Sequence, residues 1–372
     1  MSDAPGMPSS PQPWNRGTEW LKGEGPASDV VMSSRARLAR NIADCTFASR
    51  ASRVQRQHTL DTARNWLLQA GLADRMMWVD LHETSEVDKL LLVERHLISK
   101  HLARGKSHGK SKNDDASGDP RGVAVSLPDE RLCIMVNEED HLRIQVIRSG
   151  LALGECWHAI DQIDDRVEAG IEYAFSSRFG YLTACPTNVG TGLRMSVMLH
   201  LPGLRLSGDI DKVKRAASDM NLAVRGFYGE GSDSAGDFYQ ISNQTTLGKT
   251  EQTIVEELDT QIIPRVVEYE RHARRQLVEK RRLTLEDQVF RALGALTHAR
   301  LLSTDEAMQH LSHVRLGVML GMIPSVEATT VNTLMLQVQP GHLQRALGKD
   351  LDQDQRRSAR AMVVRRALGR SS

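Results

Sequence analysis

Five arginines stand in segments whose alternation of apolar and polar residues is typical of β-strands: Arg35, Arg37, Arg143, Arg194 and Arg225. Arg35 and Arg37 are two residues apart, so in an extended chain both side chains project from the same face. A guanidinium presents a planar fork of N–H donors that matches phosphate oxygens, and it keeps its charge at neutral pH. Because a phosphoryl group in transfer needs mainly positioning and charge neutralisation, the five arginines predict a cage of positive charge for a polyphosphate.

Three common nucleotide-binding patterns are absent. Residues 247–250 (LGKT) look like the end of a P-loop, but position 243 is Asn where that loop needs its first glycine. Residues 190–192 (GTG) begin a dinucleotide fingerprint, but Met195 stands where the third glycine belongs. Neither the HRD nor the DFG signature of protein kinases occurs.

The composition restricts the classes of function. The 372 residues contain 48 Lys plus Arg and 47 Asp plus Glu, a net charge of +1 that excludes a globally basic nucleic-acid-binding protein. Aromatic residues make up 4% of the chain, which argues against a stacking platform for single-stranded nucleic acid. We therefore expect no direct nucleic-acid partner.

The sequence predicts no membrane contact and a reducing compartment. No apolar stretch approaches the roughly 20 residues of a membrane-spanning helix, and residues 1–14 have no apolar core of a secretory signal. The four cysteines, Cys45, Cys133, Cys156 and Cys185, are widely spaced without a CxxC pair. We expect a cytoplasmic protein with no metal site built from side chains.

Periodicity and composition divide the chain into segments. Residues 1–27 read as a flexible leader, and the polar residues 100–121 as a mobile insertion. Strands are expected at 132–136, 142–146, 194–200 and 221–225, and a helix at 155–175. Helix-capping signals at Thr250, Thr284, Ser303 and Ser325 dominate the C-terminal part. We expect a mixed domain over residues 28–255 and a helical domain over residues 256–372.

Three motifs resemble those of the phosphagen (guanidino) kinase superfamily. Residues 185–194 (CPTNVGTGLR) are similar to its cysteine signature, residues 137–143 (NEEDHLR) to its acidic signature, and residues 33–37 (SSRAR) to its first arginine motif. The stretches that resemble one branch, the bacterial protein-arginine kinases, are 93–99, 225–232 and 240–249. The resemblance implies an α+β fold, in which an antiparallel sheet flanked by helices forms the catalytic domain and an all-α domain follows.

The resemblance also implies ATP as the phosphoryl donor. The residues that it assigns to ATP are Ser33, Ser34, Arg35, Ala36, Arg37, His96, Arg143, Arg194, Met195, Ser196, Val197, Met198, Arg225, Gly226, Phe227, Tyr228, Gly229 and Glu230. Mg²⁺ would neutralise the phosphates and be held mainly by phosphate oxygens and water, as this ion prefers.

By the same resemblance, Glu139 is the catalytic carboxylate. The acceptor would be a guanidinium, whose pKa above about 12 prevents attack until a proton leaves. Glu139 could orient the attacking nitrogen and take that proton, Glu230 could hold the other edge of the guanidinium, and a Cys185 thiolate would favour a cationic acceptor. The alternatives are solvated loop carboxylates for the two glutamates and a small buried hydrophobe for the cysteine.

Arginine side chains of proteins are the expected acceptors. Small-metabolite guanidino kinases carry a helical domain of roughly 100 residues before the first arginine motif, whereas 32 residues precede Ser33 here. Without that lid the acceptor site should admit a protein side chain. Two alternatives stay open: a kinase of free arginine or another metabolite, and a nucleotide-binding adaptor without transfer activity.

The resemblance implies several macromolecular partners. They are protein substrates with exposed arginine, a zinc-finger activator, a Clp-type protease that degrades the marked substrates, and a second copy of the chain bound through the helical domain. This implies a role in protein quality control and the stress response.

One segment departs from the protein-arginine kinases. Their C-terminal domain carries an RDxxRA motif that forms a regulatory phosphoarginine pocket, and the aligned residues here are Arg356, Arg357, Arg360 and Ala361. Arg357 occupies the position of the aspartate, and it would repel the guanidinium of phosphoarginine while attracting its phosphate. We therefore expect a degenerate regulatory pocket and an unaffected catalytic site.

Overall fold

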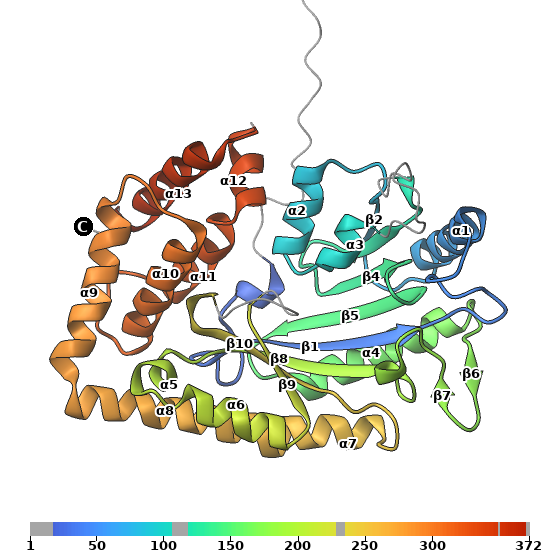
Figure 1. Ribbon diagram of the computed structural model, residues 1–372, viewed down its shortest axis with the longest axis horizontal. Helices are drawn as coiled ribbons and strands as arrows, with labels where there is room; N and C mark the ends of the chain where they lie inside the picture. The colour runs from blue at the N-terminus through green and yellow to red at the C-terminus, as the bar shows by residue number, and fades with distance from the viewer. Residues whose placement is uncertain (1–17, 106–117, 228–234, 349, 370–372) are drawn as a thin grey trace, which may run out of the picture.

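A long antiparallel sheet forms the centre of the molecule. The computed structural model describes residues 18–105, 118–227, 235–348 and 350–369 (Figure 1). In spatial order the eight strands are β2 (Met76–Asp80), β3 (Gly122–Ser126), β4 (Leu132–Val136), β5 (Leu142–Ser149), β1 (Val31–Arg40), β8 (Leu193–His200), β10 (Phe238–Asn243) and β9 (Leu222–Arg225). A separate hairpin joins β6 (Phe175–Ser176) to β7 (Gly180–Tyr181).

Helices flank this sheet and make up the C-terminal part. They are α1 (Arg53–Gln69), α2 (Glu86–Glu94), α3 (Lys100–Arg104), α4 (Leu153–Glu168), α5 (Pro202–Ser207), α6 (Ile210–Asp219), α7 (Glu251–Glu256), α8 (Ile263–Lys280), α9 (Arg282–His298), α10 (Thr304–Met319), α11 (Ala328–Gln337), α12 (Pro340–Leu347) and α13 (Gln353–Leu368). A π-helical turn, Glu257–Ile262, joins α7 to α8. The expected α+β fold is confirmed, and none of the described helices is both long and apolar enough to cross a bilayer.

The two faces of the sheet differ in chemistry because successive strand residues point to opposite sides. Ala36 and Leu38 of β1, with Ile144 of β5 and Val197 of β8, lie in one apolar core that includes residues of α4 and α8. Helix α4 packs directly on β1, β5 and β8. The opposite face of the central strands carries arginine and other polar residues.

A second core joins the C-terminal helices to one end of the sheet. Helices α9 to α13 gather on one side of the molecule in Figure 1. Buried residues of α9, α10, α11 and α13 share a cluster with Met32 of β1, Met198 of β8 and Phe238 of β10. The C-terminal helices are therefore packed against the strands rather than tethered to them.

Two segments expected to be flexible are partly packed. Trp20 and Leu21 are 2% and 4% exposed, and Trp20 Nε1 donates to the carbonyl oxygen of Arg95 at 3.3 Å. In the 100–121 segment, residues 100–104 form α3, and Arg121 is 1% exposed because its guanidinium bonds to carbonyl groups of that helix. The two predictions are wrong for these parts, whereas residues 1–17 and 106–117 lie outside the described residues.

Candidate active site

The arginines of the three central strands lie on one face of the sheet. Arg37 stands directly opposite Arg194 of β8 and Gln145 of β5, and directly opposed residues of an antiparallel pair share a face. Arg35 and Arg143 are each two residues from Arg37 and Gln145 along their own strands. Strand alternation therefore puts their side chains on the same face.

Arg225 joins this face from the edge strand β9. It pairs with Gln240 of β10, and Gln240 pairs with Met198, four residues after Arg194 on β8. Nη2 of Arg35 also donates to Oε1 of Gln240 at 3.0 Å. The structure thus brings together all five arginines that the sequence singled out. They are called the arginine cluster below: Arg35, Arg37, Arg143, Arg194 and Arg225.

Mutual repulsion and burial weaken the protonated state of the arginine cluster. Burial, followed by repulsion from Arg143, Arg194 and Arg225, lowers the pKa of Arg35 to about 9. Burial, followed by repulsion from Arg35 and the other three arginines of the cluster, holds the pKa of Arg37 well below its ordinary value. Arg37 is 7% exposed, and its Nε and Nη2 atoms have no hydrogen-bond partner among the described residues. An anion with several oxygens would supply both the missing charge and the missing acceptors, so the cluster fits the phosphates of ATP.

His96 borders the arginine cluster from the turn after α2. Its carbonyl oxygen accepts a hydrogen bond from Nε2 of Gln145 at 2.9 Å. Its ring lies edge-on to Trp20 and Phe227, with centroids 4.9 and 5.4 Å away. Burial, and then the charge of Arg35, lowers the pKa of His96 to about 3. The imidazole is therefore neutral near pH 7 and adds no further positive charge.

Four of the residues assigned to ATP point away from the arginine cluster. Ala36, Met195 and Val197 alternate with the cluster residues and lie in the apolar core on the other face. Ser34 faces that side too, where its hydroxyl bonds to the backbone of residues 150–152. A strand presents only every second residue to one face, so these four side chains lie on the side away from the arginine cluster, and their assignment to ATP stays a prediction.

The other assigned residues fall into three groups. Ser196 lies on the cluster face, and its hydroxyl accepts from Nε of Arg35 at 3.3 Å. Ser33 and Met198 also lie on this face. Gly226 and the buried Phe227 follow β9. Tyr228, Gly229 and Glu230 lie outside the described residues.

Glu139 stands in the loop between β4 and β5, called the acidic loop below (residues 137–141). Its neighbour Glu138 accepts hydrogen bonds from Nη1 of Arg143 at 2.8 and 2.9 Å and from the hydroxyl of Ser99 at 2.5 Å. Although burial opposes ionisation, Arg143 and Ser99 lower the pKa of Glu138 to about 2. Glu138 is thus ionised near pH 7 and holds one arginine of the cluster next to the acidic loop.

The acidic loop is tied to the loop that carries Cys185. Asp140 accepts a hydrogen bond from Nδ2 of Asn41 at 2.7 Å and another from the backbone N–H of Ala184 at 2.6 Å. Cys185 follows directly, is half-buried, and has its Sγ 3.0 Å from Oγ1 of Thr187. The hydrogen bond from Ala184 to Asp140 therefore joins the loop of Glu139 to the loop of Cys185.

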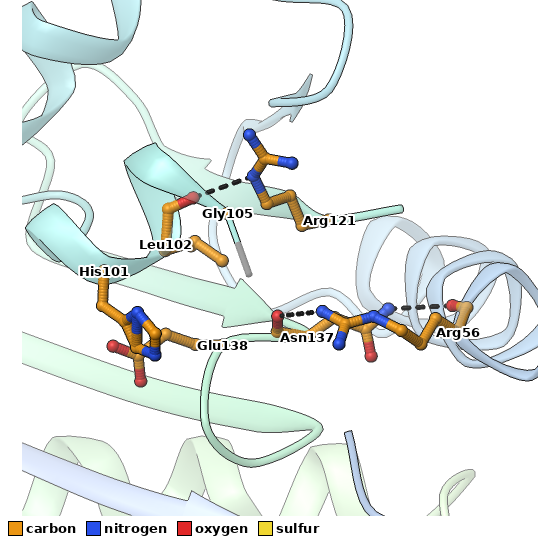
Figure 2. A pocket seen from close by; sticks show the side chains of 7 residues that line it. All are labelled: Arg56, His101, Leu102, Gly105, Arg121, Asn137 and Glu138. Carbon is orange, nitrogen blue, oxygen red and sulfur yellow. Dashed lines mark hydrogen bonds between the residues drawn. The ribbon is translucent and has the colours of Figure 1, made fainter. Parts of the chain in front are cut away.

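Buried polar residues support the acidic loop from behind (Figure 2). Arg56 of α1 donates to the carbonyl oxygen of Asn137 at 3.2 Å, and Nδ2 of Asn137 donates back to the carbonyl oxygen of Arg56 at 2.8 Å. The small hollow between these residues and α3 has a volume of about 10 Å³, the room of one water molecule. The hollow is too small for a ligand larger than water, and the residues around it hold the acidic loop in place.

A larger hollow of about 260 Å³ adjoins the loop that carries Cys185, called the cysteine loop below (residues 182–192). Its walls are the β6–β7 hairpin, residues 190–191 and residues 246–251. Phe175 and Phe179 on the hairpin are 60% and 45% exposed. This end of the site is therefore open to solvent and partly apolar.

The four residues aligned with the phosphoarginine motif lie on α13 and make different contacts. Arg360 is 2% exposed and donates to the carbonyl oxygens of Val338 and Leu302, both at 2.7 Å. Arg356 donates to a different carbonyl oxygen, and Ala361 lies in the apolar core. Arg357 lies 3.7 Å from Asp354 on its own helix. Arg360 serves here to hold backbone in place.

Sequence reasoning missed three residues that organise the site. Gln240 bridges two strands through Arg35, Glu138 holds Arg143, and Asp140 joins the two loops. Each stands inside a motif already recognised as a resemblance. The signal in the sequence is a polar residue inside a motif, and for the two acidic residues also a neighbour already assigned to the site.

The helix-flanked antiparallel sheet, with arginines on one face and a carboxylate loop at its end, defines the class of ATP:guanido phosphotransferases. The family model described as "ATP:guanido phosphotransferase, C-terminal catalytic domain" matches residues 62–273. The model described as "Protein-arginine kinase McsB C-terminal domain" matches residues 282–372.

Within this class, the chain belongs to the protein-arginine kinase family. It is 45% identical over 354 residues to the protein-arginine kinase of Symbiobacterium thermophilum, a match covering 94% of this chain and 96% of that one. It is 43% identical over 351 residues to the protein-arginine kinase of Halalkalibacterium halodurans, covering 94% of each chain. These comparisons confirm the resemblance drawn from the motifs.

Solved structures support the same fold. A duplicated taurocyamine kinase from Schistosoma mansoni, with bound transition-state-analogue components, matches with a TM-score of 0.56 and 27% identity, over 67% of this chain and 34% of that one. A lombricine kinase matches with a TM-score of 0.54 and 25% identity, over 67% of this chain and 68% of that one.

Proposed function

We propose that this chain transfers the γ-phosphoryl group of ATP to arginine side chains of proteins. The observation that carries the proposal is the arginine cluster beside the linked loops of Glu139 and Cys185. Membership of the protein-arginine kinase family supports proteins as the acceptors.

Each part of the site has a task in this reaction. The arginine cluster binds the phosphates and neutralises the charge that spreads over the transferring group. Glu139 aligns the acceptor guanidinium and takes its proton. The new bond forms between that nitrogen and the γ-phosphorus, while the bond from the γ-phosphorus to the β–γ bridging oxygen breaks and ADP leaves. Cys185, on the loop tied to the acidic loop, helps to bind the acceptor guanidinium.

Magnesium is part of the proposal as the companion of ATP. Among the described residues no three His, Cys, Asp or Glu side chains group so as to hold a metal ion. The cluster of fixed cations suits an arrangement in which Mg²⁺ is held by phosphate oxygens and water. When bound, the ion would add charge neutralisation to that of the arginines.

The stability of the product bond tests the reaction. The chain is incubated with γ-labelled ATP and an unfolded arginine-rich protein, such as reduced and alkylated lysozyme. A phosphorus–nitrogen bond is labile in acid and persists in alkali, so label should leave in hot acid, and mass spectrometry should place it on arginine. Label that survives hot acid would show that the acceptor is a hydroxyl group.

Free arginine in a parallel assay separates the two kinase hypotheses. Faster ATP consumption with free arginine than with the unfolded protein would favour a metabolite kinase. No transfer to either acceptor, with partner binding retained, would favour an adaptor. The complete arginine cluster and the position of Glu139 support the kinase.

We further propose a cytoplasmic setting and a homodimer, with a zinc-finger activator and a Clp-type protease as partners. All four cysteines are unpaired thiols, as a reducing compartment favours. Sedimentation velocity tests the dimer. The substrate protein is incubated with ATP and either the active chain or Glu139→Gln, and its co-purification with the protease is compared. Co-purification only after incubation with the active chain would show that the protease recognises the phosphorylated substrate.

A further inference from the structure

The C-terminal helix α12 is bound directly to the end of α2. The carboxylate of Glu94, the last residue of α2, accepts hydrogen bonds from the backbone N–H of Gly341 at 2.7 Å and of His342 at 3.0 Å. Nδ1 of His342 lies 2.7 Å from the same carboxylate. Glu94 is 3% exposed. Its buried carboxylate therefore accepts hydrogen bonds from backbone N–H groups in the first turn of α12, which have no partner within their own helix.

The two helices approach too closely for any side chain at position 341. A Cβ atom on Gly341 would lie 2.8 Å from Oε2 of Glu94 and 2.9 Å from the backbone nitrogen of Leu91. Glycine is therefore needed because of this approach. The contact fixes both the distance and the rotation of α12 relative to α2.

The two residues that follow Glu94, Arg95 and His96, connect the contact with α12 to the arginine cluster. Arg95 is 2% exposed; its guanidinium binds the carboxylate of Glu130 at 2.7 to 3.0 Å and lies 3.3 Å from Nε2 of His342. The next residue, His96, has a φ of 60°. Because this conformation is strained for a residue with a side chain, the turn needs contacts on both sides to persist.

The far side of the turn is held by the sheet itself. Gln145 donates from Nε2 to the carbonyl oxygen of His96 at 2.9 Å. Gln145 is also the β5 residue directly opposite Arg37. A continuous path of contacts therefore runs from α12 through Glu94, Arg95 and His96 to the strand pair that carries the arginine cluster.

We propose that Glu94 is a positioning residue for the nucleotide site. By binding the first turn of α12, its carboxylate holds the His96 turn against the arginine cluster, so that the C-terminal helical part completes the site where ATP binds. The inference rests on the proposed function only in taking the arginine cluster as the nucleotide site.

Two substitutions break the contact from its two sides. Glu94→Gln replaces an acceptor-only group by an amide whose NH₂ faces backbone donors. Gly341→Ala forces α12 away from α2. The matched control is Asp88→Asn, the same change of carboxylate to amide on the same helix, where Asp88 lies 3.5 Å from Arg345 of α12 and belongs to the other end of α2.

The readouts are the affinity for ADP by calorimetry, the KM for ATP, kcat and the melting temperature. We expect about a tenfold weaker affinity for ADP and a similar rise in the KM for ATP in Glu94→Gln and Gly341→Ala, at the lower end of typical couplings between sites. We expect a smaller change in kcat. Asp88→Asn should bind ADP like the unchanged chain. A lower melting temperature with unchanged ADP affinity would reduce Glu94 to a structural residue and overturn the proposal.

A third variant, His342→Phe, tests the proposal even if Glu94→Gln or Gly341→Ala fails to fold. It removes the ring nitrogen from Glu94 and leaves the two backbone hydrogen bonds, so it should weaken ADP binding in the same direction by a smaller factor. Unchanged affinity in this variant would also overturn the proposal. ADP binding does not depend on the acceptor, so an absence of phosphoarginine would end the proposed function without touching this inference.

Discussion

At the scale of single residues, Arg37 favours nucleotide binding but destabilises the fold when no nucleotide is bound. It is a buried cation among other cations, with donors that no described residue satisfies. Unsatisfied buried donors cost about 1–3 kcal/mol each. We predict that Arg37→Met raises the free energy of unfolding without nucleotide by roughly 1–3 kcal/mol, while ADP affinity falls. Urea unfolding and calorimetry measure the two effects, and a destabilised variant would contradict the repulsion argument.

Glu139 is the residue on which the chemical step depends. Glu139→Gln keeps the shape of the side chain but cannot take a proton. We expect kcat to fall by roughly 10²- to 10⁴-fold, with ADP affinity almost unchanged. Steady-state kinetics and calorimetry check the two halves of this prediction. Near-normal turnover would remove the proposed base.

Glu138 gives a prediction about acid. The pKa of Glu138 falls from 4.5 to about 2 in the folded chain, against the effect of burial, because of Arg143 and Ser99. A lowered carboxylate pKa stabilises the fold above pH 4.5, and this contribution is lost as the pH falls towards 2. Glu138→Gln should therefore be less stable than the unchanged chain at pH 7, with the difference shrinking below pH 4.5. Urea unfolding at pH 7, 4 and 3 measures it, and a constant difference would contradict the assignment.

Single residues also show which parts of the site can be predicted from the sequence. The arginines and Glu139 were identified because strand periodicity and long motifs mark them. Glu94 and His342 carry no local signal, since their contact joins positions 248 residues apart. Only the folded chain brings them together.

At the scale of elements, alternation of apolar residues predicted β4, β5, β8 and β9 within a few residues. The helix expected over 155–175 ends at Glu168, and Tyr173 pairs instead with Ile42 in an isolated bridge. Ser303 forms the expected capping box, but Thr284 lies inside α9, which begins at Arg282. Helix ends depend on neighbours that a local pattern does not contain.

The cysteine loop supplies a prediction at this scale. Gly190 has a φ of 110°, and a Cβ atom there would lie 2.4 Å from the carbonyl oxygen of Thr246. Gly190→Ala should strain the loop by about 1–3 kcal/mol and lower kcat more than ADP affinity. Gly248→Ala is the control, since Gly248 has a φ of 81° with nothing within 4 Å of its Cβ position. Equal losses of kcat in both variants would show that backbone conformation alone matters.

At the scale of the whole molecule, the C-terminal helices and the N-terminal segment complete the core of the sheet. The buried residues Trp20, Met32, Phe227 and Phe238 belong to the same cluster as residues of α9, α10, α11 and α13. Sequence composition separated a mixed part from a helical part, but it could not show this shared core, which depends on contacts between distant segments.

Removal of the C-terminal helices tests the shared core. A chain ending at residue 281 would expose aromatic residues whose burial contributes about 1.5–3 kcal/mol each. We expect it to melt at a lower temperature than the full chain and to bind a fluorescent hydrophobic dye. Equal melting temperatures would show that the catalytic part folds independently.

The two-faced sheet has a consequence for how this sequence can change over time. In β1, arginine and core residues alternate one by one between the strand partners β5 and β8. Loss or gain of one codon within β1 would shift the following residues to the wrong side, putting guanidinium groups into the apolar core and aliphatic groups beside the nucleotide. Substitutions in this strand can act by degrees, whereas frame-preserving insertions and deletions should survive only in the connecting loops.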